Sequence, residues 1–290
     1  MAEDGGNKGK QERKEVKGAF MPLVSVVIPA YNCSRTLGKA IDSALAQDIP
    51  LEVLVLDDCG AESLAEIIEG YRVNPAVRYV KNERNLGACA SRNIGVEMAK
   101  GKYVAFLDAD DWWEKGKLQK QLQRIQETGT VLCTTARELV TPDGRLTGRV
   151  IPVTEKITYR QMLRGNCINC SAVLLRRETA QEFPMCHEDS HEDYIAWLKI
   201  LKKYGEACAV NEPLLKYRLS SSGKSGNKLK SAGMTFKVYR YMGFGIVKSV
   251  GCFLGYACHG LGKYAGAHLR GLRKGEKNGR SEGVGDCSGL

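Results

Sequence analysis

The sequence predicts an α/β protein with a mostly parallel central sheet flanked by helices. Short apolar runs rich in β-branched residues alternate with segments whose apolar residues recur at helical spacing. This alternation is typical of parallel strands joined by right-handed crossovers. Several apolar runs end in acidic residues, which would meet at the carboxyl edge of the sheet, where such proteins bind ligands. The chain has 290 residues, 43% of them hydrophobic, and is long enough for one large core or two small ones.

The first part of the chain repeats a strand and helix unit. A β-branched run closes at Pro29, and Gly101 ends a later helix just before the next strand. In order, the spacing predicts a strand at 23–28, a helix around 37–45, a strand at 51–56, a helix around 64–71, a strand at 77–80, a helix over 85–100 and a strand that carries Asp108.

The pattern becomes mixed in the second part of the chain. Leu118, Leu122 and Ile125 share one face of a predicted helix. The residues Thr141-Pro142-Asp143-Gly144 favour a hairpin-like turn after a strand at 130–135. A strand at 173–175 and a helix over 191–204 follow, and no internal repeat is visible.

Charge divides the chain unevenly. Residues 1–223 carry 31 basic and 30 acidic side chains, whereas residues 224–290 carry 12 basic and 3 acidic ones. A uniformly basic surface for nucleic acid is therefore not expected. We predict a disordered extension at 1–20, a catalytic domain at 21–223, a basic amphipathic helical region at 224–264 and a disordered tail at 265–290.

A cluster of carboxylates follows the fourth predicted strand of the sheet. Asp108 and Asp110 alternate there, and hard oxygen ligands of this kind suit Mg²⁺ or Mn²⁺ held jointly with phosphates. An isolated Asp-x-Asp is more often an acidic surface turn. Asn32 and the pair Asp57-Asp58 would add polar groups at neighbouring strand ends, which favours a metal-bridged nucleotide.

These motifs stand in the order found in the family 2 inverting glycosyltransferases, which the sequence closely resembles over roughly residues 22–225. The matching segments are Val24-Ser25-Val26-Val27-Ile28-Pro29-Ala30-Tyr31-Asn32, Leu56-Asp57-Asp58, Asn85-Leu86-Gly87 with Arg92-Asn93, Phe106-Leu107-Asp108-Ala109-Asp110-Asp111 and Glu192-Asp193-Tyr194. The resemblance implies a Rossmann-like glycosyltransferase A fold, a nucleotide-diphosphate sugar donor and a role in bacterial surface polysaccharide biosynthesis.

The resemblance also implies how the donor is held. Asp108 and Asp110 would bind a divalent metal, Mn²⁺ or Mg²⁺, and a UDP-sugar is the expected donor. Two assignments have plain alternatives: Arg92 as an outward-facing helix residue, and Arg218 as part of a basic linker that continues through Ser222–Ser225. The residues expected to contact the donor are Pro29, Ala30, Tyr31, Asp57 or Asp58, Gly87, Arg92, Asp108 and Arg218.

Inversion at the anomeric carbon needs one general base. The resemblance places the base in the pair Glu192-Asp193, and we assign it to Asp193, with Glu192 as the alternative. The same pair could be an ordinary acidic helix start, which the helix dipole favours. Gly165 replaces the Trp of the Gln-x-x-Arg-Trp motif of processive synthases, so the expected reaction transfers one sugar per encounter.

Other functions remain open from the sequence. The segment His187-Glu188-Asp189-Ser190-His191 matches the His-Glu-x-x-His pattern of zinc hydrolases, although it is polar and follows Pro184. A sugar-nucleotide-binding scaffold without catalysis is a second alternative. The lone Cys167-x-x-Cys170 pair favours core packing over a metal or redox site.

The chain's surroundings are predicted from its cysteines and its C-terminal region. Eleven cysteines, an odd number, are expected to be reduced thiols, and residues 1–17 lack the apolar segment of a signal peptide. Residues 236–261 mix aromatic, aliphatic and basic side chains but are too interrupted for a confident membrane span. We therefore predict a cytoplasmic protein, peripheral on the cytoplasmic face of the inner membrane. Its acceptor would be a glycan or a lipid-linked oligosaccharide, and no nucleic-acid partner is expected.

Overall fold

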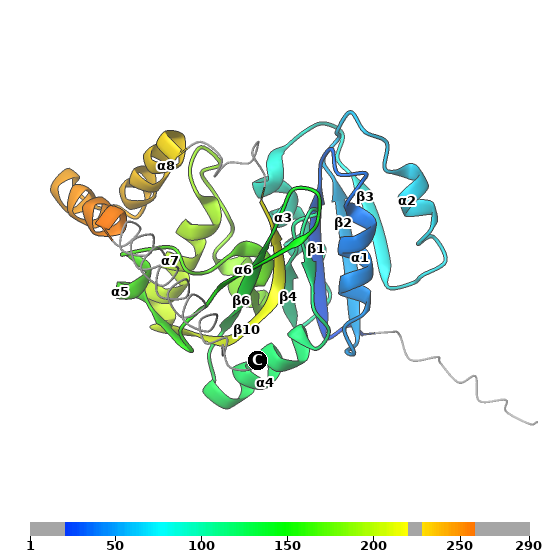
Figure 1. The fold of residues 1–290 in the computed structure, drawn as a ribbon, viewed down its shortest axis with the longest axis horizontal. Helices are drawn as coiled ribbons and strands as arrows, with labels where there is room; N and C mark the ends of the chain where they lie inside the picture. Colours follow the sequence, from blue (N-terminus) through cyan, green and yellow to red (C-terminus); the bar gives the residue numbers. More distant parts are fainter. Residues whose placement is uncertain (1–20, 220–227, 259–290) are drawn as a thin grey trace, which may run out of the picture.

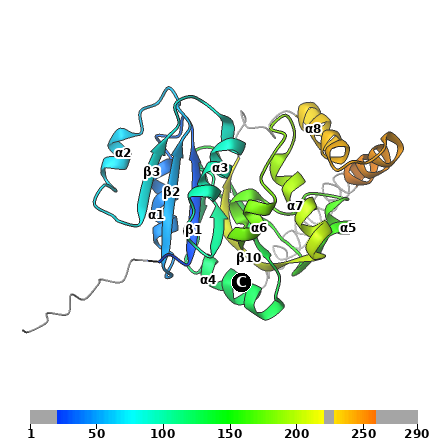
Figure 2. The same ribbon diagram turned by 180° about the vertical axis from the view of Figure 1, so that it is seen from behind.

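The computed structural model describes residues 21–219 and 228–258, which form an α/β fold around one ten-stranded sheet (Figure 1). Helices cover both faces of the sheet, as the view from behind also shows (Figure 2). Eight strands form the continuous path β3-β2-β1-β4-β9-β6-β10-β5, and β7 and β8 pair with β6 and β10. The predicted fold class is therefore confirmed.

The first part of the chain forms the parallel side of the sheet. Strand β1 pairs in register with β2 and β4, and β2 pairs with β3, all in parallel. The predicted elements are present in the predicted order, although the second helix is only five residues long. Their bounds are β1 Val24–Ala30, α1 Leu37–Leu45, β2 Leu51–Asp57, α2 Ala65–Glu69, β3 Val77–Lys81, α3 Gly87–Met98 and β4 Tyr103–Phe106.

The second part of the chain completes the sheet with strands of both directions. Strand β9 lies antiparallel between β4 and β6, and β10 is parallel to β6. Six strands, β1 to β4 with β6 and β10, therefore run in one direction. The bounds are β5 Trp112–Trp113, α4 Lys117–Thr128, β6 Leu132–Val140, β7 Leu146–Ile151, β8 Lys156–Thr158, α5 Tyr159–Met162, η1 Cys170–Ala172, β9 Leu174–Arg176, α6 Arg177–Glu182, α7 Glu192–Tyr204 and β10 Glu206–Arg218.

Strand β10 was not predicted from the sequence. Its centre contains Asn211, Glu212 and Pro213, and its pairing with β6 shifts between Val210 and Leu215. A proline and polar residues at a bulge hide the strand pattern, because the bulge interrupts the ladder where these residues lie. Arg218 therefore ends a strand and does not begin a linker, and residues 222–225 lie outside the described residues.

Two apolar cores lie on opposite faces of the sheet. One contains side chains of α1 and α4, such as Ile41 and Leu118, and the other contains side chains of α3, α5 and α7. The second core also receives Val238 of α8 (Lys228–Tyr241), which packs against α7. Cys167 and Cys170 belong to this core, as expected of a structural pair, and the ten cysteines of the described segments are all free.

Beyond α8, residues 246–258 form a further helix, and Figures 1 and 2 show both helices on the α7 side of the molecule. Within residues 21–219 and 228–258, every helix falls short of the length and apolar character needed to cross a bilayer.

Candidate active site

The acidic strand ends lie side by side, as the parallel sheet requires. Ala30 at the end of β1 pairs with Asp57 at the end of β2, and the Asp58 amide donates to the Ala30 carbonyl at 2.8 Å. Asp108 follows β4, the other neighbour of β1, by two residues. One edge of the sheet therefore carries Asp57, Asp58, Asp108 and Asp110.

The carboxylates at the end of β2 are buried and occupied by hydrogen bonds. Asp57 accepts from the Tyr79 hydroxyl and from the Cys59 amide at 3.0 Å. Asp58 accepts from the amides of Leu86 and Gly87, both at 2.8 Å, and from the side-chain amide of Asn82. Asp58 thus holds the first turn of α3 against the sheet.

The end of β1 forms the open rim of the site. Ala30 is buried and Pro29 half-buried, whereas Tyr31 is 53% exposed. Asn32 has a φ of 48°, in the left-handed region that asparagine tolerates. Its Oδ1 accepts from the Ala61 amide at 2.8 Å, which ties the loop after β1 to the loop after β2.

Gly87 begins α3 with a φ of +87°, a conformation that favours glycine. A Cβ at this position would lie 2.0 Å from Oε1 of Glu188, so a side chain would collide with that carboxylate. The close approach that glycine permits is therefore made here by Glu188, from the segment before α7. From the sequence we expected Gly87 to contact the donor.

Arg92 connects three elements of the site. Its Nη2 lies 2.6 Å from Oδ1 of Asp108, and its Nη1 lies 3.2 Å from Oε1 of Glu192. Burial alone would lower the pKa of Arg92, but the surrounding anionic groups, including both carboxylates, raise it well above its usual value. The outward-facing interpretation of Arg92 is therefore wrong, because the side chain is buried between α3, the β4 end and α7.

The carboxylates after β4 lie close together, and their negative charges repel one another. Burial and the neighbouring charge of Asp108 raise the pKa of Asp110 to about 6. Burial and the charges of Asp108 and Asp110 raise the pKa of Asp111 well above its usual value, and its Oδ2 is buried without a hydrogen-bond partner. A cation placed among these groups would favour their charged forms.

The chemistry of this cluster fits a divalent metal. Asp108 and Asp110 supply hard carboxylate oxygens, the ligands that Mg²⁺ and Mn²⁺ prefer. In the described segments no group of three or more His, Cys, Asp or Glu side chains could hold a metal ion. A metal here would therefore take its remaining ligands from water and from the phosphates of a bound nucleotide.

Asp111 is a site residue that the sequence analysis did not assign. Its Oδ1 accepts from the Arg218 amide at 2.8 Å, and the Arg218 Nε donates to the Asp110 carbonyl at 2.9 Å. The Arg218 Nη1 also donates to the carbonyl of Pro142, in the turn between β6 and β7. Arg218 thus connects the carboxylate loop to the end of β10. The run of three acids around Ala109 was the only sequence signal for Asp111.

Ser171 is a second residue that was not assigned. It is fully buried in η1, and its hydroxyl accepts from the Asp108 amide at 3.1 Å. Its carbonyl accepts from the Trp113 indole N–H at 2.7 Å. These two bonds hold the carboxylate loop in place. No local sequence motif predicts them.

The paired acids Glu192 and Asp193 begin α7 beside this cluster. Glu192 is committed to the ion pair with Arg92. Burial and the charge of Glu192 raise the pKa of Asp193 to about 6, against the opposing effect of Arg92. A carboxyl group with this pKa can accept a proton near neutral pH.

The zinc motif is not supported by the geometry. His187 has a φ of 66°, lies outside α7 and stacks on the Tyr241 ring. His191 immediately precedes α7, and its Nε2 lies 3.3 Å from the Ser231 carbonyl. The two histidines therefore do not share one helical face, which the zinc pattern requires.

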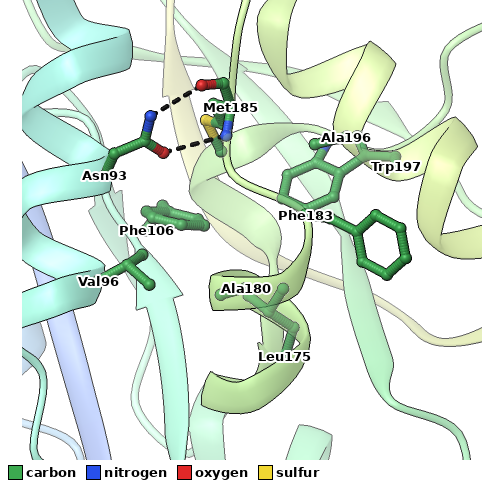
Figure 3. Close-up of a pocket in the computed structure, with 9 residues that line it drawn as sticks. All are labelled: Asn93, Val96, Phe106, Leu175, Ala180, Phe183, Met185, Ala196 and Trp197. Carbon is green, nitrogen blue, oxygen red and sulfur yellow. Dashed lines mark hydrogen bonds between the residues drawn. The ribbon is translucent and has the colours of Figure 1, made fainter.

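A small apolar cavity lies behind the site, between α3, β4, α6 and α7 (Figure 3). At its edge, the Asn93 side chain exchanges two hydrogen bonds with the Met185 backbone, at 2.8 and 3.0 Å (Figure 3). Phe106 and Trp197 line the cavity and pack with ring centroids 6.4 Å apart. The Asn93 bonds attach the segment before α7 to α3 at the residue next to Arg92.

Comparison with known proteins gives consistent matches. The family model described as Glycosyl transferase family 2 matches residues 25–182. A Bacillus subtilis (strain 168) protein named as the teichuronic acid biosynthesis glycosyltransferase TuaG is 36% identical over 84% of this chain and 98% of its own length. The Escherichia coli protein WfaP, named UDP-Glc:alpha-D-GlcNAc-diphosphoundecaprenol beta-1,3-glucosyltransferase, is 33% identical over 84% of this chain and 96% of its own length.

Solved structures share the fold. Staphylococcus aureus TarS 1–349 in complex with UDP-GlcNAc matches with a TM-score of 0.64 at 19% identity, over 81% of this chain and 71% of that one. The Pyrobaculum calidifontis mannosyltransferase PcManGT, in complex with GDP-Man and Mn²⁺, matches with a TM-score of 0.62 at 14% identity, over 91% of this chain and 82% of that one.

Proposed function

This chain belongs to glycosyl transferase family 2 and is a glycosyltransferase of bacterial polysaccharide biosynthesis, and we propose that it transfers one sugar, with inversion, from a UDP-sugar to a lipid-linked oligosaccharide. The observation that carries the proposal is the Arg92 bridge between Asp108 and Glu192. The bridge joins the carboxylates suited to a metal-bound donor to the helix that carries the expected base.

The donor is proposed to bind across the ends of β1 and β2. Tyr31 offers an exposed ring for the base, and Pro29, Ala30 and Asp57 lie beside it on adjacent strands. Asp58 supports this site indirectly, because its carboxylate is committed to α3. The preference for UDP draws on the UDP-Glc donor in the name of WfaP and on the UDP-GlcNAc bound to TarS.

Asp108 and Asp110 are proposed to hold Mn²⁺ or Mg²⁺ together with the donor diphosphate. The metal would act as a Lewis acid that stabilises the negative charge developing on the departing nucleoside diphosphate. Arg92 keeps Asp108 oriented through its 2.6 Å contact, and Ser171 holds the backbone of the same residue. Arg218 fixes the loop through the Asp110 carbonyl, which adds a positioning role to the donor contact expected from the sequence.

Asp193 is proposed as the general base. Glu192 is held by Arg92, whereas Asp193 has a pKa of about 6 because of burial and the Glu192 charge. Asp193 would take the proton from the acceptor hydroxyl as its oxygen attacks the anomeric carbon opposite the leaving diphosphate. The new bond forms on the face opposite the old one, so the configuration inverts.

The acceptor is proposed to be presented at a membrane surface. WfaP is named for a diphosphoundecaprenol acceptor, and residues 228–258 of this chain carry five basic and no acidic side chains. The helix over 246–258 exposes Val247, Val250 and Leu254 on one face, with exposed fractions of 42–87%. Apolar side chains flanked by basic ones suit peripheral contact with anionic lipid on the cytoplasmic face of the inner membrane.

The first test is nucleoside diphosphate release from UDP-, GDP- and dTDP-sugars, with Mn²⁺ or with EDTA. We expect metal-dependent release from a UDP-sugar, increased by a diphosphoundecaprenol-linked acceptor. Absence of release from every donor, together with absence of donor binding by calorimetry, would reject the catalytic proposal in favour of a non-catalytic scaffold. Anionic vesicles that fail to retain the protein would reject the membrane part alone.

A further inference from the structure

The segment 187–191, which leads into Glu192 and Asp193, lies between the donor side of the site and helix α8. On its inner side, the Glu188 carboxylate lies against Gly87 at the start of α3. Just before the segment, the Met185 backbone is bonded to Asn93 of α3. The segment is thus placed to transmit any displacement to the first turn of α7.

On its outer side, the segment is held by two residues of α8. Lys237 Nζ lies 2.7 Å from Oδ2 of Asp189, and the Tyr241 hydroxyl donates to the same carboxylate at 3.0 Å. The Tyr241 ring also stacks on His187, with centroids 3.7 Å apart and planes 9° apart. We call these contacts of Lys237 and Tyr241 with Asp189 and His187 the α8 clasp.

The α8 clasp has a rigid base. Val238 and Tyr239 of α8 are fully buried, and the Tyr239 hydroxyl donates to the Leu163 carbonyl at 2.8 Å. A His187 φ of 66° is costly for a non-glycine residue and persists only where contacts impose it. The stacked Tyr241 ring and the bonds to Asp189 are the contacts that flank this conformation.

We propose that Lys237 and Tyr241 are positioning residues for the reaction, because the α8 clasp sets the place of Glu192 and Asp193. The inference rests on the proposed function, in which Asp193 is the base. It gives helix α8 a role in positioning the base, whereas the charge pattern alone had suggested a separate basic region. A base displaced by a small distance loses much of its effect on the rate.

The other end of α7 offers a matched control. There Lys203 and the Tyr204 hydroxyl both contact the carboxylate of Glu182, as Lys237 and Tyr241 both contact Asp189. In both sets the lysine and the carboxylate are half-exposed. The control set joins α6 to the C-terminal end of α7, away from Glu192.

The experiment compares K237M/Y241F with K203M/Y204F in the full chain. We expect the clasp variant to lower kcat for acceptor transfer by about tenfold to 100-fold, with KM for the donor unchanged. The control variant should keep kcat within about twofold, since its contacts lie at the opposite end of α7 from Glu192 and Asp193. The single variant Lys237→Arg, which preserves the charge, should keep most of the activity that the single variant Lys237→Met loses.

Hydrogen exchange of residues 187–193 gives a readout that does not need turnover. We expect faster exchange there in the clasp variant only. Equal kcat in the two variants, or unchanged exchange over 187–193, would overturn the inference. An inactive wild-type enzyme would instead count against the proposed function, and the exchange measurement would then decide the α8 clasp by itself.

Discussion

The ends of β2 and β4 carry similar acidic sequences but place their carboxylates in opposite situations. At the β2 end, Asp57 and Asp58 accept hydrogen bonds from side chains and backbone amides around them. At the β4 end, burial and mutual repulsion raise the pKa values of Asp110 and Asp111. Asp57 and Asp58 therefore receive their hydrogen bonds from the protein itself. Asp110 and Asp111 need a nearby cation to be stable in their charged forms.

This difference indicates that the acids at one edge of the sheet fall into a structural pair and a catalytic group. Acids served by fixed donors orient loops and helix starts, and their loss should affect folding first. Acids whose pKa values are raised, such as Asp110, would be stabilised in their charged form by a metal, and their loss should affect turnover first. The predictions below test that separation.

The largest effect is expected for Asp110→Ala. Removing one of the two carboxylates suited to the metal should lower turnover about 1000-fold, because the leaving group loses electrostatic stabilisation. The thermal midpoint should stay the same or rise, since a buried carboxyl group with a raised pKa is removed. Turnover against Mn²⁺ concentration and a melting curve provide the measurements. Asp48→Ala, on an exposed residue just before β2, is the control; an active Asp110→Ala enzyme would break the comparison.

Asp193→Asn should lower turnover about 100-fold to 10,000-fold while donor affinity stays unchanged. The base must be deprotonated, so wild-type kcat/KM should rise with pH through about 6, where Asp193 titrates. The pH profile and donor calorimetry test both parts. A profile that is flat between pH 5 and 8, or wild-type turnover in the variant, would transfer the role to Glu192.

Asp58→Ala should act on stability. It leaves the amides of Leu86 and Gly87 without their carboxylate acceptor, at a cost of about 3 kcal/mol in the free energy of unfolding. Denaturant unfolding measures the loss, and Asp58→Asn, which keeps one acceptor oxygen, should lose less. If Asp58→Ala abolished turnover with no loss of stability, Asp58 would have to act in the reaction, as we propose for Asp108 and Asp110.

The smallest effect is expected for Tyr79→Phe. The change removes the hydroxyl that donates to Asp57, and the stability loss should be about 1 kcal/mol. Donor affinity should change less than twofold if the Cys59 amide alone keeps Asp57 oriented. Calorimetry with UDP on both proteins would show whether the hydroxyl matters more than this.

Much of the parallel side could be predicted because its signals are local. The strands there are short, mostly apolar runs followed by acidic or polar turns, so their succession along the chain, their parallel direction and the shared edge followed from the pattern. The second half was harder to predict, because the bulge around Pro213 interrupts the strand pattern of β10 and because β5 has only two residues. Such strands are stabilised mainly by pairing with neighbouring strands, and those neighbouring strands are distant in sequence.

By itself, the sequence determined the α/β class, the parallel direction of the first strands and the presence of Asp57, Asp58, Asp108 and Asp110 at one edge, because these follow from residue type and spacing along the chain. Only the tertiary structure decided how those groups are used. Arg92 joins carboxylates 16 and 100 residues away, Gly87 receives Glu188, and α8 holds the segment before Asp193. Burial and contacts between distant segments set these roles, and neither can be read from local composition.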